Sequence, residues 1–314
     1  MKSRHGSKAV IVAAIIGNLI VAIMKFVAAA LTGSSAMISE GIHSLVDTGN
    51  GGLMLYGIKE ARKPADKDHP FGHGKALYFW VLVVSISIFG IGGGMSLYEG
   101  ISHIRHVAPE FVLANPIVNY IVLGLAAAVE GWSLSVAVKE FRRLKGQKSA
   151  WQFIRQTKDP STFTIVLEDG AAMLGLLLAF MGVFFGHMFK NPYLDGMASI
   201  LIGILLMFVA FLLAFETKGL LLGEGVSPEM LKDIRSRIEA DPSVEQAAEI
   251  LTMYLGPREL LINIGVRFKK DTSLTEVHDA IHRIEKNIQK SYPERMRVYI
   301  EVESFLRKRE ANSP

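Results

Sequence analysis

The most informative polar side chains of this 314-residue chain lie inside an otherwise apolar segment. Glu40, His43, Asp47 and Asn50 recur at steps of three or four residues, which places them along one face of a helix. An imidazole and a carboxylate one turn apart, as at His43 and Asp47, suit two positions of a tetrahedral metal site. The spacing therefore predicts half of a metal site, with the other ligands on another helix. An interhelical hydrogen-bond pair is the alternative interpretation.

A second set of candidate ligands is the adjacent pair Glu168 and Asp169, also in an apolar segment. Adjacent positions on a helix diverge by about 100°, so both carboxylates do not point equally well at one ion. We expect one of them to be a ligand, Glu168 before Asp169. The alternative is that one of them caps the helix or pairs with Lys25. Lys25 itself and Glu130 are interpreted as packing or charge-balancing groups.

A third set of candidates lies in a short polar segment between two apolar ones. It contains Asp66, Asp68, His69 and His73, and two imidazoles with carboxylates suit zinc with nitrogen and oxygen ligands. A solvated polar loop is the equal alternative. Because the chain has no cysteine, every metal ligand must be nitrogen or oxygen.

Most of the chain that positions these residues is apolar. Half of the residues are hydrophobic and the mean hydropathy is +0.31, which is hard to reconcile with one soluble globule. Each long apolar segment reaches the roughly 20 residues that cross a bilayer. These segments are 8–31, 35–58, 78–104, 115–138, 162–186 and 194–215. The pattern predicts an all-α membrane domain of six transmembrane helices.

Basic residues orient the six predicted spans. Lysines and arginines crowd the second and fourth connections, whereas the first has none and the third and fifth hold only Arg105 and Lys190. Short cytoplasmic loops retain Lys and Arg, so we expect both termini in the cytoplasm of a multi-pass protein, in a bacterial-type inner (plasma) membrane. This distribution accounts for the basic pI of about 9.1 without a nucleic-acid partner.

The composition turns charged and amphipathic beyond Glu216, which indicates a second domain. We expect a transmembrane domain over 1–222 and a cytosolic domain over 223–314. The second domain is predicted to be α+β, with the ferredoxin-like order αββαβ. Its elements are a helix from Pro228, strands over 246–254 and 259–268, a helix over 275–288 and a strand over 296–302. Because so small a core is marginal alone, we expect a homodimer.

These residues resemble the cation diffusion facilitator family over nearly the whole chain. The motifs that carry the resemblance are Gly33-Ser34-Ser35-Ala36, the His43 to Asp47 segment, the loop from His69 to Lys75, and Asp195 at the entry of the sixth span. The subgroup that contains the ninth mammalian zinc transporter is the most similar, judged from Leu167-Glu168-Asp169 with Ala171-Ala172.

The resemblance implies a dimer whose protomers alternate between inward-open and outward-open states and exchange metal for protons. In the family, the second-span ligands pair with a His-x-x-x-Asp set in the fifth span. Here Glu168 and Ala172 stand at those positions, so one ligand has changed and one is missing. The loop site carries over as Asp66, His69 and His73.

The resemblance also bears on the predicted cytosolic domain. His278 alone is in place from the family's cytosolic metal cluster, while Asn263, Gly265 and Glu301 stand where ligands are usual. We therefore expect this domain to dimerise without a full binuclear zinc site.

We expect a secondary transporter rather than an enzyme, with Zn²⁺ as the transported substrate and protons as the counter-ion, exporting metal from the cytosol. The expected metal residues are His43, Asp47, Glu168, Asp169, Asp66, His69 and His73. One alternative is a membrane metal sensor that does not transport, and another is a carrier for Mn, Fe or Co. An intramembrane metallohydrolase is less favoured, because no His-Glu-x-x-His pair accompanies His43.

Overall fold

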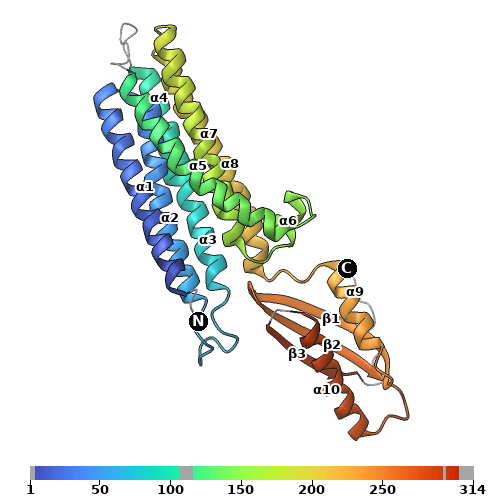
Figure 1. Cartoon of the computed structure of the whole chain (residues 1–314). Coiled ribbons are helices and arrows are strands. Elements are labelled where there is room, and N and C mark those ends of the chain that lie inside the picture. Colours follow the sequence, from blue (N-terminus) through green and yellow to red (C-terminus); the bar gives the residue numbers. More distant parts are fainter. Residues whose placement is uncertain (1–3, 107–115, 293–294, 304–314) are drawn as a thin grey trace. The chain divides into compact units, whose positions relative to one another are not determined.

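The computed structural model describes residues 4–106, 116–292 and 295–303, and Figure 1 shows its helices and strands. The chain forms two compact units. One contains Met1–Glu60 and Ala76–Lys218, and the other contains Ala61–Lys75 and Gly219–Pro314. The polar loop between the second and third spans thus packs with the second unit. The expected division between residues 222 and 223 stays a prediction.

The first unit is built from long helices. Its elements are α1 (Arg4–Thr32), α2 (Ser35–Glu60), α3 (Ala76–Ser87), the π-helical segment η1 (Ile88–Gly94), α4 (Met95–His106), α5 (Ile117–Lys145), α6 (Ala150–Gln156), α7 (Pro160–Met188) and α8 (Tyr193–Leu222). Each predicted span corresponds to a helix of the described chain, with α3, η1 and α4 together forming the third. The short helix α6 was not predicted, although Ser149 and Gln152 form a capping box at its start.

Five of these spans, α1, α3 to α4, α5, α7 and α8, are long and apolar enough by composition to cross a membrane. The remaining span, α2, has 26 residues, and its polar face lowers its hydropathy. Large hydrophobic side chains are exposed all along the unit, as at Trp132, Phe211 and Leu31. Such exposure is expected of helices that face lipid rather than water.

Helix α2 packs among the other spans, in contact with α1, α3, α4 and α7. Close approach elsewhere depends on glycine: a Cβ on Gly100 of α4 would lie 2.7 Å from the carbonyl oxygen of Gly196 in α8. Small residues at such crossings let membrane helices pack backbone to backbone. Because α1, α3, α4 and α7 all contact α2, the polar face of α2 is enclosed by neighbouring helices.

The second unit confirms the predicted αββαβ order. Its elements are α9 (Pro228–Glu239), β1 (Val244–Gly256), β2 (Glu259–Phe268), α10 (Leu274–Ser291) and β3 (Arg295–Val302). Strand β2 is central, antiparallel to β1 and parallel to β3. Alternate residues of β2, such as Ile262 and Ile264, are fully buried against Ile234 of α9 and Ile284 of α10. The period of two in β2 thus builds the core.

The loop Ala61–Lys75 packs onto the turn between β1 and β2. A Cβ on Gly74 would collide with the carbonyl oxygen of Leu255, so only glycine permits this approach. The guanidinium carbon of Arg297 in β3 lies 5.5 Å from the ring centre of Phe71. The sheet therefore holds the segment that carries His69 and His73.

Candidate metal centre

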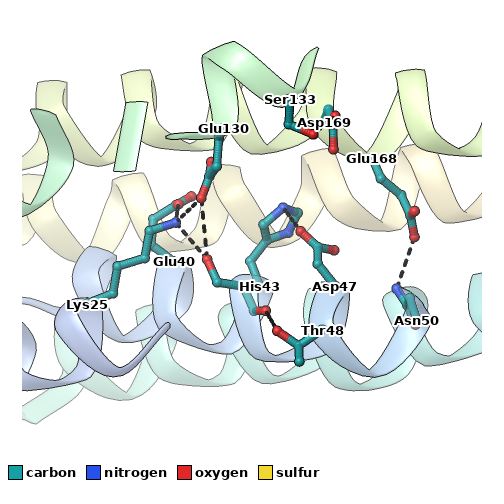
Figure 2. Close-up of polar contacts among 11 residues, drawn as sticks. Lys25, Glu40, His43, Asp47, Thr48, Asn50, Glu130, Ser133, Glu168 and Asp169 are labelled. Atoms are coloured by element: carbon teal, nitrogen blue, oxygen red, sulfur yellow. Dashed lines mark hydrogen bonds and ion pairs between the residues drawn. The ribbon is translucent and has the colours of Figure 1, made fainter. Parts of the chain in front are cut away.

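The central polar pair of the membrane unit is His43 and Asp47 on α2. Their Nε2 and Oδ2 atoms are 3.1 Å apart, and the side chains are 4% and 16% exposed. Figure 2 shows both side chains on the same face of α2. The helical spacing in the sequence predicted this arrangement, which offers one imidazole nitrogen and one carboxylate to a metal ion.

The start of α2 is held by a residue from α8. Asp195 accepts hydrogen bonds from the hydroxyl of Ser34 at 2.7 Å and from the backbone N–H groups of Ser35 and Ala36. Asp195 thus acts as an N-cap supplied from another helix, and it satisfies donors that the first turn leaves unpaired. The sequence placed Asp195 at the entry of the sixth span but did not indicate this capping role, because a cap from 160 residues away leaves no local signal.

Helix α7 places Glu168 and Asp169 on the side that faces α2. The two carboxylates diverge, as expected for adjacent helical positions. Glu168 Oε1 accepts a hydrogen bond from the Asn50 amide of α2 at 3.0 Å. Asp169 Oδ2 accepts one from the hydroxyl of Ser133 in α5 at 2.8 Å. In Figure 2, Asp47 lies between His43 and Glu168, whereas Asp169 lies beside Ser133.

Lys25 pairs with neither Glu168 nor Asp169. Its Nζ lies 2.8 Å from each of Glu40 Oε2, Ser44 Oγ and Glu130 Oε1. The interpretation of Lys25 and Glu130 as charge-balancing groups agrees with these contacts, whereas the place of Glu40 among them was not predicted. The one available signal was the position of Glu40, one turn before His43 and Ser44.

The loop site brings its three predicted residues together. One ligand atom from each of Asp66, His69 and His73 lies within 4.8 Å of the others. His69 Nδ1 is 3.2 Å from Asp66 Oδ1, and His73 Nε2 is 3.5 Å from Asp66 Oδ2. Three nitrogen and oxygen atoms at this separation fit a tetrahedral ion that keeps one open position.

Backbone groups orient this cluster. His73 Nδ1 lies 3.2 Å from the carbonyl oxygen of Pro64, and donation to that carbonyl leaves Nε2 free to bind a metal. The backbone N–H of His69 donates to Asp66 Oδ1 at 2.7 Å. That hydrogen bond holds the pKa of Asp66 below its usual value, so the carboxylate is ionised and ready to accept a cation.

The second unit shows a smaller grouping around His278. Its ring centre lies 4.5 Å from that of His282, whose Nδ1 is 3.7 Å from Glu285 Oε2. Whether the domain lacks a full binuclear site, as expected, stays a prediction.

Two family models match the chain. Residues 11–222 match the cation efflux transmembrane domain, and residues 226–305 match the cytoplasmic domain of cation efflux proteins. The human protein named proton-coupled zinc antiporter SLC30A9, mitochondrial, is 34% identical over 265 residues, which cover 84% of this chain and 46% of the relative. This chain therefore spans about half the length of the SLC30A9 proteins that it matches.

Two other relatives are similar at lower identity. Metal tolerance protein C4 of Arabidopsis thaliana is 27% identical over 270 residues, covering 85% of this chain and 58% of the relative. The cation-efflux pump FieF of Escherichia coli (strain SMS-3-5 / SECEC) is 26% identical over 287 residues, covering 91% and 89%. Together with the helical unit, the αββαβ unit and the matched models, these likenesses confirm the resemblance seen in the motifs: the chain belongs to the cation efflux, or cation diffusion facilitator, family.

Proposed function

We propose that this protein is a secondary transporter that exports divalent transition-metal ions, with zinc as its main substrate, from the cytosol in exchange for protons. The observation that carries the proposal is the buried pair His43 and Asp47 on α2, which faces Glu168 and Asp169 on α7. An ionisable cluster at membrane depth is costly unless it binds a partner of opposite charge.

The charge of the cluster supports a cation as that partner. Among the side chains that the structure describes, Lys25 is the one buried lysine or arginine, and its bonds go to Glu40, Ser44 and Glu130. Asp47, Glu168 and Asp169 thus have no buried lysine or arginine of the described chain to themselves, and the basic group in contact with them is the imidazole of His43, 3.1 Å from Asp47. A divalent ion supplies the missing positive charge.

The donor atoms support zinc. One imidazole nitrogen with carboxylate oxygens suits a tetrahedral zinc ion, with a water in any position that the protein leaves open. Ala172, one helical turn after Glu168, is buried and supplies no ligand. The zinc antiporter named among the relatives agrees with this assignment.

Proton exchange follows from the same donors, because carboxylates and imidazole must be deprotonated to bind a metal. Alternating exposure of one site to the two sides of the membrane then couples metal movement to proton movement. We further propose that the loop residues Asp66, His69 and His73 bind a second metal ion on the cytosolic side. The cytosolic domain is the proposed homodimer contact.

The test is zinc flux into proteoliposomes under an imposed pH gradient. We expect wild-type protein to carry Zn²⁺. When Mn²⁺, Fe²⁺ or Co²⁺ is added as a competitor, we expect it to reduce the zinc flux less than added Zn²⁺ does. Asp47→Ala removes a proposed ligand and is expected to lower the flux at least about tenfold. Glu140→Gln is the matched control, since it neutralises an exposed acid of α5 that pairs with Arg143 on the same helix.

Two outcomes would contradict the proposal. Transport by Asp47→Ala at the wild-type rate would remove the α2 pair from the transport site. Tight zinc binding by wild-type protein without any flux would instead favour a membrane metal sensor.

A further inference from the structure

A buried ion cluster lies beside the proposed metal residues, and its members are not among the proposed ligands. Lys25 of α1 donates to Glu40 and Ser44 of α2 and to Glu130 of α5, each at 2.8 Å. An ammonium group has three N–H donors, so these bonds satisfy Lys25 completely. The side chains of Lys25 and Glu40 are fully buried and that of Glu130 is 10% exposed.

The cluster has more acid than base. One ammonium faces two carboxylates, which leaves one excess negative charge when both are ionised. The second oxygens, Glu40 Oε1 and Glu130 Oε2, are also buried and accept no hydrogen bond from the part of the chain that the structure describes. A buried charge without a partner is strongly unfavourable, so the cluster gains from one more positive charge.

A proton is the ligand that fits this excess. A metal ion would have to approach the Lys25 ammonium, which repels it and already occupies one oxygen of each carboxylate. A proton adds to the free oxygen of either glutamate without moving the lysine. The donor set therefore selects H⁺ over a divalent cation.

Helix α7 fixes one side of the cluster. A Cβ on Gly175 would collide with Glu40 Oε1, so the free carboxylate oxygen lies against the backbone of α7. Helix α7 also carries Glu168 and Asp169. The free oxygen of Glu40 thus packs against the same helix that carries the acidic residues Glu168 and Asp169.

The surroundings of the cluster connect it electrostatically to the metal residues. The cluster is made of Lys25 from α1, Glu40 from α2 and Glu130 from α5. The ionisable groups beside it are His43 from α2 and Asp169 from α7, whereas Asp47 and Glu168 lie beyond His43 in Figure 2. His43 lies next to Ser44 in sequence and separates the cluster from Asp47 in Figure 2. The described structure shows no hydrogen bond from Lys25, Glu40 or Glu130 to His43 or Asp47. The two sites therefore interact through charge rather than through shared atoms.

We propose that Lys25, Glu40 and Glu130 form a proton-binding site, separate from the metal ligands, that holds one proton when the metal residues are empty. When a divalent ion binds at His43 and Asp47, its field favours the ionised cluster, and the carboxyl group releases its proton to water. When the ion leaves, the cluster takes a proton up again. This inference rests on the proposed metal/proton exchange and assigns one of its protons.

The test counts protons released as zinc binds to full-length protein in detergent, in weak buffer with a pH dye. With Glu130→Gln, Lys25 and Glu40 balance each other, so about one fewer proton per zinc ion is expected to be released. Zinc affinity is expected to change only a few fold. Glu40→Gln is the second variant and is expected to give the same loss. Glu140→Gln, on the same helix as Glu130, is expected to release as many protons as wild type.

A flux measurement separates proton coupling from a structural ion cluster. In proteoliposomes, Glu130→Gln is expected to keep zinc-for-zinc exchange and to lose most of its acceleration by an imposed pH gradient. Wild-type proton release in a folded Glu130→Gln or Glu40→Gln protein would overturn the proposal. Because proton release is measured without transport, a failure of the transport proposal would appear separately, as wild-type protein that binds zinc without carrying it.

Discussion

The Asp195 carboxylate of α8 accepts a hydrogen bond from the hydroxyl of Ser34 at 2.7 Å and so ties α8 to the start of α2. The same carboxylate accepts the backbone N–H groups of Ser35 and Ala36. Helix α2 carries His43 and Asp47, which lie two to three turns further on. The first turn of the helix that carries His43 and Asp47 is thus positioned by a residue of the last span.

Asp195→Ala is expected to remove the acceptor of three donors at and just before the start of α2. Loss of a buried cap of this kind costs about 1–3 kcal/mol, so the thermal midpoint of unfolding in detergent should fall. Zinc affinity should fall with it, because α2 loses its anchor. Asp195→Asn keeps one acceptor oxygen and should show a smaller effect. Wild-type stability of Asp195→Ala would show that Asp195 does not hold α2.

Glu168 and Asp169 are expected to differ in their effect on zinc binding. Glu168 bonds Asn50, which lies on the same face of α2 as His43 and Asp47, whereas Asp169 bonds Ser133 of α5. Glu168→Gln should therefore weaken zinc binding about tenfold or more, and Asp169→Asn should weaken it less. Equilibrium zinc titration of both proteins measures the difference, and the reverse order would make Asp169 the ligand.

The loop site predicts a change in zinc stoichiometry. Asp66→Asn removes the carboxylate that contacts both His69 and His73, so the full-length protein should bind about one zinc ion fewer per chain. Asp68→Asn is the matched control, because Asp68 is an exposed neighbour outside the three-residue cluster. Elemental analysis after equilibrium dialysis measures the ratio. An unchanged ratio of zinc to protein in Asp66→Asn would show that the loop does not bind a metal ion.

The αββαβ domain is expected to lose stability in acid. Arg283 holds the pKa of Asp241 below its usual value, through contacts of 2.8 Å and 2.9 Å. A lowered folded-state pKa stabilises the domain above the ordinary Asp pKa of about 3.9, and this stabilisation is lost as the pH falls through the folded-state pKa. Asp241→Asn should therefore be less stable near pH 7 and should lose less on acidification.

The measurement for this prediction is the thermal midpoint of residues 223–314, expressed alone, in a series of buffers from neutral to acidic pH. Asp271→Asn serves as the control, since Asp271 is exposed. Equal acid sensitivity of Asp241→Asn and wild type would show that the pair with Arg283 does not govern the acid response.

Much of the fold was predictable because its signals are local. The length of an apolar segment sets a membrane span, and a period of two or of 3.6 residues sets a strand or a helix. These rules found the six spans and the αββαβ unit. They missed the π-helical segment Ile88–Gly94, where only the glycines at 90 and 92–94 hinted at irregular helix. They also missed α6, which is shorter than the pattern rules resolve.

The sequence by itself determined which residues were candidates and which of them share a local element. His43 and Asp47 are four residues apart on one helix, and Asp66, His69 and His73 are within eight residues of each other, so their proximity is set by local geometry. Only the tertiary structure decided which helices face each other. Lys25 meets Glu130 across 105 positions and Asp195 meets Ser34 across 161, because helix packing in a membrane is set by the fit of whole surfaces and not by spacing along the chain.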